Sequence, residues 1–182
     1  MHPFKLAACA ALMASVASTG FAQTMAPSTP AASQQATAKA SVPGTADFLT
    51  KAATGNKFEI DSSKLALDKS KSETVRAFAN MMVKDHGGAA VKMKRAVTEA
   101  KLPAQAAALD AKHQAMLDDL AKKEGPAFDK AYVDAQLKGH EETVALFKAY
   151  ADGGENPRIK QFAEDLLPVL QKHLDQARKL QA

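Results

Sequence analysis

The side chains able to bind a metal ion or move a proton are few in this 182-residue chain. Four of them share one property, a position among apolar residues that recur with the spacing of one helix face: Glu59, His86, His140 and His173. Imidazole and carboxylate groups are ligands of zinc, iron, copper and manganese, and the cores of helical bundles host such sites. The sequence therefore predicts a site for a divalent transition-metal ion, with these four side chains as ligands.

The positions of the four residues along their helices support this prediction. Glu59 and His86 lie about 10 and about 14 residues from the turn that joins their helices, which is roughly 15 and 21 Å of helix. His140 and His173 lie about 11 and about 16 residues from their own turn, which is roughly 17 and 24 Å. All four are therefore expected within one or two helical turns of each other.

Further polar side chains on the inward faces are expected to support such a site. They are Asn56, Asp129, Gln136 and His113. A second interpretation stays open, in which each histidine is structural and hydrogen-bonds a neighbouring helix. Glu59 then pairs with Asn56, a tyrosine hydroxyl or a histidine, because a buried carboxylate must be paired or protonated.

The sequence carries no recognisable signature of catalysis. Di-iron bundles use Glu-x-x-His pairs on one helix, whereas Val83, Leu137 and Leu170 stand three residues before the core histidines. The comparable pair Asp110 and His113 lies on a short helix, so a ferroxidase-type centre is not expected. A phosphate-binding loop with its lysine and a serine nucleophile elbow are both missing. The sequence favours a non-enzymatic protein over an enzyme.

The elements that must position these residues are predicted to be helices. Alanine is abundant and aromatic residues make up only 5% of the chain, a composition that favours helix over sheet. Thr45 and Ser72 are candidate N-caps. Helices are predicted at about residues 46–69, 72–101, 110–124, 126–151 and 157–180. Short connections between the first pair and the last pair predict two antiparallel hairpins. The predicted fold is an all-α, antiparallel four-helix bundle with one extra short helix.

The first 22 residues are typical of a secretory signal peptide. Lys5 precedes an apolar run, and small residues stand at the positions that a signal peptidase reads before cleavage after Ala22. The segment ending at Cys9 also resembles a lipoprotein cleavage box, an alternative that its early position disfavours. Residues 23–44, rich in Pro, Ser and Thr, predict a flexible tether, so the bundle domain is expected at residues 45–182.

Export and composition narrow the classes of function. Cleavage after Ala22 removes the single cysteine, so the mature chain has no disulfide and no thiolate metal site. The 24 basic and 20 acidic residues of the full chain are interspersed, which argues against a nucleic acid partner. No later run is long and apolar enough to span a membrane. We therefore expect a periplasmic protein, free or peripheral to the outer membrane.

Several motifs between residues 45 and 180 resemble one bacterial envelope family. They are Phe48-Leu49 with Ala52-Ala53-x-Gly55-Asn56 and Glu59-Ile60, Val75-x-x-Phe78-Ala79-x-x-Met82-Val83-x-Asp85-His86, Phe128-Asp129-x-Ala131-Tyr132, His140-Glu141, and Leu167-Pro168-x-Leu170-x-x-His173-Leu174. Together they resemble the family catalogued as domain of unknown function 4142. The resemblance implies an exported, ferritin-like four-helix bundle and no particular activity. The chain departs from the family pattern at Gly87-Gly88.

Three functional predictions follow from these observations. The first is a periplasmic binding protein, linked to envelope stress only through its compartment and fold relatives. The second is a metal storage or redox protein that uses the inward glutamate and histidines. The third is an interaction module whose envelope protein partner binds the irregular region at residues 103–126.

Overall fold

The computed structural model describes residues 41–181, which contain five helices and no strand. The helices are α1 (Thr45–Lys69), α2 (Glu73–Glu99), α3 (Ala111–Ala121), α4 (Gly125–Gly153) and α5 (Pro157–Gln181). The predicted all-α helical bundle is confirmed. The predicted signal peptide, residues 1–22, and most of the predicted tether, residues 23–44, lie outside the described residues.

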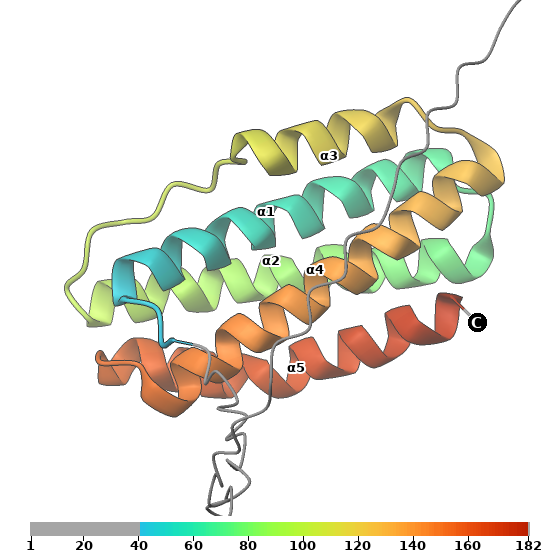
Figure 1. Cartoon of the computed structure of the whole chain (residues 1–182). Helices are drawn as coiled ribbons and strands as arrows, with labels where there is room; N and C mark the ends of the chain where they lie inside the picture. The colour runs from blue at the N-terminus through green and yellow to red at the C-terminus, as the bar shows by residue number, and fades with distance from the viewer. Residues whose placement is uncertain (1–40, 182) are drawn as a thin grey trace, which may run out of the picture. The chain divides into compact units, whose positions relative to one another are not determined.

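Four long helices form the bundle, and α3 lies on its outer side (Figure 1). α1 packs most extensively against α2, and α4 packs most extensively against α5, so both predicted hairpins are formed. α2 also packs against α5 and α1 against α4, which closes the bundle. α3 lies along α1 and has few contacts with α4, so it covers a side of the bundle rather than one end.

The helix N-termini show which capping predictions were correct. Ser72 caps α2 and accepts a hydrogen bond from the backbone N–H three residues later. Asp110 caps α3 and accepts from the backbone N–H of His113 at 2.8 Å. The prediction of Thr45 as an N-cap was wrong, since the preceding glycine takes that position. The Thr45 hydroxyl instead lies 2.6 Å from the Tyr150 hydroxyl and joins α1 to α4.

The connection between α3 and α4 also differs from the prediction. α3 ends at Ala121, three residues earlier than predicted, and α4 begins at Gly125 instead of residue 126. Gly125 has a φ of +55°, a left-handed conformation that glycine adopts without strain. α5 continues as one helix through Pro168.

Two apolar clusters hold the four long helices together. One lies towards the α4–α5 turn and includes Phe48, Leu49, Met93, Val97, Phe147, Tyr150, Ile159 and Phe162. The other lies towards the α1–α2 turn and includes Phe58, Val75, Phe78, Met82, Leu120, Phe128 and Tyr132. Between them along the helices are six buried polar residues, here called the polar layer: Glu59, Ser62, His86, Gln136, His140 and His173. The polar layer is therefore enclosed by apolar packing on both sides.

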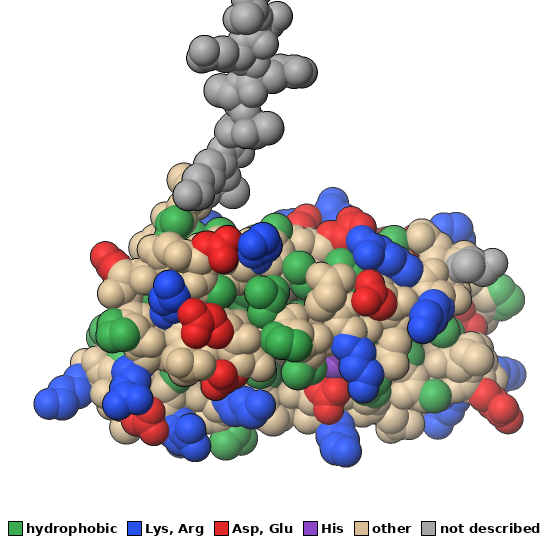
Figure 2. Space-filling model, turned by 90° about the horizontal axis from the view of Figure 1, so that it is seen from below, with side chains coloured by type: hydrophobic (Ala, Val, Ile, Leu, Met, Phe, Trp, Pro, Cys, Tyr) green, Lys and Arg blue, Asp and Glu red, His purple; other side chains and the backbone are tan. Residues whose placement is uncertain are grey.

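The surface of the bundle carries mixed charge. Basic and acidic side chains are interspersed over the face shown in Figure 2. Among residues 41–181, only Val42 and Val91 are large hydrophobic side chains with high exposure. None of the helices in this range has the length and apolar content that crossing a membrane requires.

Truncating the aromatic centre of the first cluster is expected to destabilise the bundle strongly. Phe48 is fully buried, stacks on Tyr150 with ring centroids 4.2 Å apart, and meets Phe147 edge-on at 5.0 Å. Phe48→Ala should lower the free energy of unfolding by about 3–5 kcal/mol in urea denaturation, because it leaves a cavity. The exposed control Val91→Ala should change it by less than about 0.5 kcal/mol. Equal effects of the two variants would contradict this view of the core.

Candidate metal centre

Three imidazole rings from three different helices meet in the polar layer. His86 comes from α2, His140 from α4 and His173 from α5, and none is more than 4% exposed. Their ring centroids lie 5.4 to 5.6 Å apart. One ring nitrogen of each lies within 4.8 Å of one nitrogen in both other rings. Metal–nitrogen bonds of about 2.0–2.1 Å place the nitrogens of one site about 3.4 Å apart, so the three rings are grouped closely enough to be a candidate metal site.

Each ring of this three-histidine cluster is held by one hydrogen bond. His86 Nδ1 lies 3.0 Å from Asn56 Oδ1, and His173 Nε2 lies 3.0 Å from Asp85 Oδ2. His140 Nδ1 lies 2.9 Å from the backbone carbonyl oxygen one turn earlier in α4. All three partners are oxygen acceptors, so the bonded nitrogen of each ring is the one that carries the proton.

The second nitrogen of each ring has no partner. Within residues 41–181, His86 Nε2, His140 Nε2 and His173 Nδ1 are buried and make no hydrogen bond. Because the proton sits on the bonded nitrogen, the free nitrogen carries a lone pair. A ring fixed by an oxygen on one nitrogen, with the lone pair of the other available, is the arrangement found in metal-binding histidines.

Burial favours the neutral, metal-binding form of two of the rings, those of His86 and His173. It lowers the pKa of His86 well below its usual value of 6.5, and the neighbouring rings of His140 and His173 lower it further. Burial also lowers the pKa of His173, although the hydrogen bond to Asp85 opposes this shift. At neutral pH these two imidazoles are therefore uncharged, as metal coordination requires.

Glu59 lies beside the three-histidine cluster rather than within it. Its Oε1 is 3.8 Å from His140 Nδ1, the nitrogen that already donates a hydrogen bond, and its Oε2 has no hydrogen-bond partner in the described part of the chain. Burial raises the pKa of this carboxyl above its usual value, while the charge of His140 lowers it. Glu59 is therefore placed to orient His140 and to supply negative charge next to the cluster.

The structure separates the residues singled out from the sequence. Asn56 and Gln136 lie in contact with the cluster through His86 and His140. His113 lies on α3, half-buried, and its Nδ1 bonds Asp110 at 2.7 Å instead of joining the other histidines. Asp129 is half-buried on α4, near the end of the bundle at the α1–α2 turn. That these four residues support a metal site stays a prediction.

Sequence reasoning missed several residues that build this region. Asp85 accepts the hydrogen bond that holds His173. The sequence signal for this residue was a carboxylate directly before the core histidine His86. Ser62 and Ser63 are fully buried, and Ser62 accepts a hydrogen bond from the Gln136 amide at 3.1 Å. Both serines follow Glu59 by one helical turn, which was the signal in the sequence. At Gly139 a Cβ would lie 2.9 Å from Glu59 Oε1, so this glycine leaves room for the carboxylate.

Comparisons with known proteins agree with this architecture. The sequence profile of the domain of unknown function DUF4142 matches residues 19–180. No curated protein sequence matches significantly. A solved structure described as "CopM in the Cu(II)-bound form" has a similar fold, with a TM-score of 0.62 and 18% sequence identity. The alignment covers 74% of this chain and 93% of that chain. At this identity the likeness shows a shared fold alone.

The metal-free protein is expected to lose stability in acid. Unfolded histidines titrate near 6.5, whereas the pKa values of folded His86 and His173 are lower, so the unfolded state binds more protons below that pH. Urea denaturation in a chelator should show the free energy of unfolding falling as pH drops below about 6.5, by at most about 1.4 kcal/mol per pH unit for each histidine. His86→Gln should make this dependence shallower.

Glu59 shifts stability in the opposite direction. The pKa of Glu59 in the folded protein lies above 4.5, the ordinary value for glutamate. At a pH between these two pKa values, the folded state holds a proton that the unfolded state has released. Glu59→Gln should therefore make the acid loss steeper. A free energy of unfolding that stays constant between about pH 5 and 7 in all three proteins would contradict both assignments.

Proposed function

The chain belongs to the DUF4142 family, and from this premise we propose that it is an exported protein that binds one copper(II) ion at the three-histidine cluster. One observation carries the proposal. Three buried imidazoles, each fixed by an oxygen acceptor on one nitrogen, have three free nitrogens within one small region of the bundle core. A late transition-metal ion is the ligand that three such lone pairs fit.

The alternative of purely structural histidines explains the same geometry less well. A structural histidine in a dry core is expected to satisfy its polar atoms, because a buried unsatisfied group costs about 1–3 kcal/mol. Here three ring nitrogens carry that cost together, in rings whose centroids lie 5.4 to 5.6 Å apart. A bound ion removes the cost at all three nitrogens at once.

The donor set favours copper or zinc over other ions. It consists of imidazoles alone, without a thiolate or carboxylate in the compact group. Imidazole suits zinc, copper, iron and nickel, and a nitrogen site binds divalent copper most tightly of this series. The similarity in fold to CopM, whose solved structure is in a copper(II)-bound form, also supports copper. Three protein ligands leave a further position for water or another ligand.

The surrounding charges suit a divalent cation. Three neutral rings leave the full charge of the ion uncompensated, and a buried charge must be paired. Asp85 bonds His173 directly, and Glu59 lies 3.8 Å from His140. These two carboxylates lie next to the ligand rings and can balance the two positive charges of the ion without coordinating it. Glu59 therefore has a role in the proposed site without being one of the three ligands that hold the bound ion.

The proposed location is the periplasm. Residues 1–22 have the composition of a secretory signal peptide. The family match begins at residue 19, so most of this segment precedes the shared domain. In this compartment we propose that the bundle holds or delivers copper rather than catalysing a reaction.

Metal content tests the proposal. The mature chain, purified without a His-tag and loaded with copper(II), should contain one ion per chain by elemental mass spectrometry. His86→Ala should weaken binding at least about hundredfold, because it removes one of three ligands. His113→Ala, a histidine outside the cluster, should leave the affinity unchanged. Protein that takes up neither copper nor zinc, or that loses the ion equally in both variants, would refute the proposal.

The residues that hold the rings should tune affinity without setting stoichiometry. Asn56→Ala and Asp85→Asn should each weaken copper(II) binding about 10–100-fold in a competition titration. Each variant loses or weakens the hydrogen bond that fixes the orientation of one ligand ring. Asp134→Asn removes a surface carboxylate that pairs with Lys130 and serves as the matched control. An unchanged affinity in both Asn56→Ala and Asp85→Asn would show that the rings do not coordinate the ion.

A further inference from the structure

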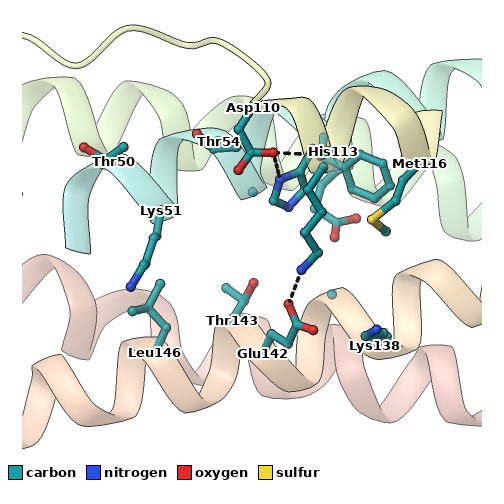
Figure 3. Close-up of a pocket in the computed structure, with 15 residues that line it drawn as sticks. Thr50, Lys51, Thr54, Asp110, His113, Met116, Lys138, Glu142, Thr143 and Leu146 are labelled. Atoms are coloured by element: carbon teal, nitrogen blue, oxygen red, sulfur yellow. Dashed lines mark hydrogen bonds and ion pairs between the residues drawn. The ribbon is translucent and has the colours of Figure 1, made fainter. Parts of the chain in front are cut away.

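A pocket of about 420 Å³ lies between α1, α3 and α4 (Figure 3). α3 contributes Met116 and His113 with the preceding Asp110, while α4 contributes Thr143 and Leu146 from the opposite side. The buried carboxylate of Glu59 also lines the pocket. This pocket therefore extends from the surface to Glu59, which lies 3.8 Å from a ring of the three-histidine cluster.

Two smaller spaces lie deeper in the bundle beside this pocket. A void of about 20 Å³ shares Gly55, Glu59 and Thr143 with the pocket and also borders His86. A second void of about 20 Å³ shares His86 with the first and borders His173. Each void exceeds the roughly 10–15 Å³ that one water molecule needs. The pocket and the two voids are thus neighbours that share lining residues, and the voids border two of the three rings.

The contacts of Glu59 point to a ligand role for its free oxygen. Glu59 as a residue is 4% exposed, and its Oε2 has no hydrogen-bond partner within residues 41–181. Glu59 borders both the pocket and the first void, and its other oxygen lies 3.8 Å from His140. Gly139 leaves the space that this carboxylate occupies. A buried carboxylate with a free oxygen is a ready partner for a cation.

The lining of the pocket as a whole, with Glu59 at its inner end, has no net formal charge. Its charged lining residues balance in formal charge: Lys51, Lys112, Lys138, Glu59, Asp110 and Glu142. Lys112 of α3 lies 3.3 Å from Glu142 of α4, and no other hydrogen bond or ion pair in the described residues joins these two helices. Exposed pairs of this kind contribute at most about 1 kcal/mol, so α3 is held only lightly over α4.

We propose that the metal ion reaches the three-histidine cluster through the pocket between α1, α3 and α4, and that Glu59 is its first protein ligand on the way in. This inference rests on the proposed function. The ion exchanges a water for Glu59 Oε2 at the inner end of the pocket and then passes the Gly55–Thr143 wall to the imidazole nitrogens. Glu59 therefore controls the rate of loading, in addition to balancing charge once the ion is bound.

The opposite side of the bundle offers a competing path. The void beside His173 is also lined by Asp85 and Val169, between α2 and α5. It is small, and the Asp85 carboxylate already accepts the hydrogen bond of His173. An ion arriving there would have to break the contact that fixes its own ligand, which favours the Glu59 side.

The rate of copper(II) loading separates the two paths. Bound copper(II) quenches tyrosine emission, and the chain contains two tyrosines and no tryptophan, so stopped-flow fluorescence reports the rate. Thr143→Leu puts a larger side chain between the pocket and the first void and so narrows the proposed passage. Glu59→Gln removes the carboxylate that is proposed to bind the entering ion, with little change in the shape of the side chain. Val169→Leu adds the same kind of bulk on the α2–α5 side and is the matched control. Equilibrium stoichiometry and circular dichroism are recorded for every variant.

We expect Thr143→Leu and Glu59→Gln each to slow loading about tenfold or more, with one ion per chain still bound at equilibrium. Release to a chelator should slow in Thr143→Leu as well, because the same wall is crossed outwards. Val169→Leu should load at the wild-type rate. Wild-type rates in both test variants, or slowing only in Val169→Leu, would overturn the inferred path. A wild-type protein that binds no copper would instead refute the proposed function.

Discussion

The structure depends on one constraint, the burial of three imidazoles and a carboxylate in the middle of an apolar bundle. Removing these groups from water is costly unless each polar atom finds a partner. The bundle meets half of the requirement with an oxygen acceptor for one nitrogen of each ring. The other three nitrogens lack a partner in the described residues, and this leaves a set of lone pairs that a single cation can satisfy. The burial of apolar side chains in the clusters on both sides must offset the free-energy cost of burying this polar layer.

The arrangement of helices explains why the site sits where it does. Each ring of the cluster comes from a different helix, so the cluster forms only when both hairpins have docked on each other. α1 contributes no ring and instead supplies Asn56 and Glu59, which hold or neighbour rings from two other helices. α3 lies beside α1 and across the pocket from α4 (Figures 1 and 3), and Glu59 is among the residues that line this pocket. The short helix therefore covers the pocket beside the site.

Helical periodicity was sufficient to predict much of this structure. The hairpins, the bundle and the inward position of Glu59, His86, His140 and His173 all follow from the spacing of apolar residues. Periodicity does not report which ring nitrogen faces a neighbour, so the roles of Asp85 and the backbone carbonyl that holds His140 were out of reach. It also placed Glu59 at the right height without showing that the carboxylate lies beside a ring rather than among the three.

Electron paramagnetic resonance of the copper(II)-loaded protein tests most directly whether three imidazoles share one ion. Pulsed spectra should show coupling to nitrogens of three histidine rings in the wild-type protein, and to two rings in His173→Ala. The same spectrum in both proteins, or a copper signal without coupling to histidine nitrogens, would contradict a metal centre at the three-histidine cluster. The buried rings would then be structural elements of a polar core.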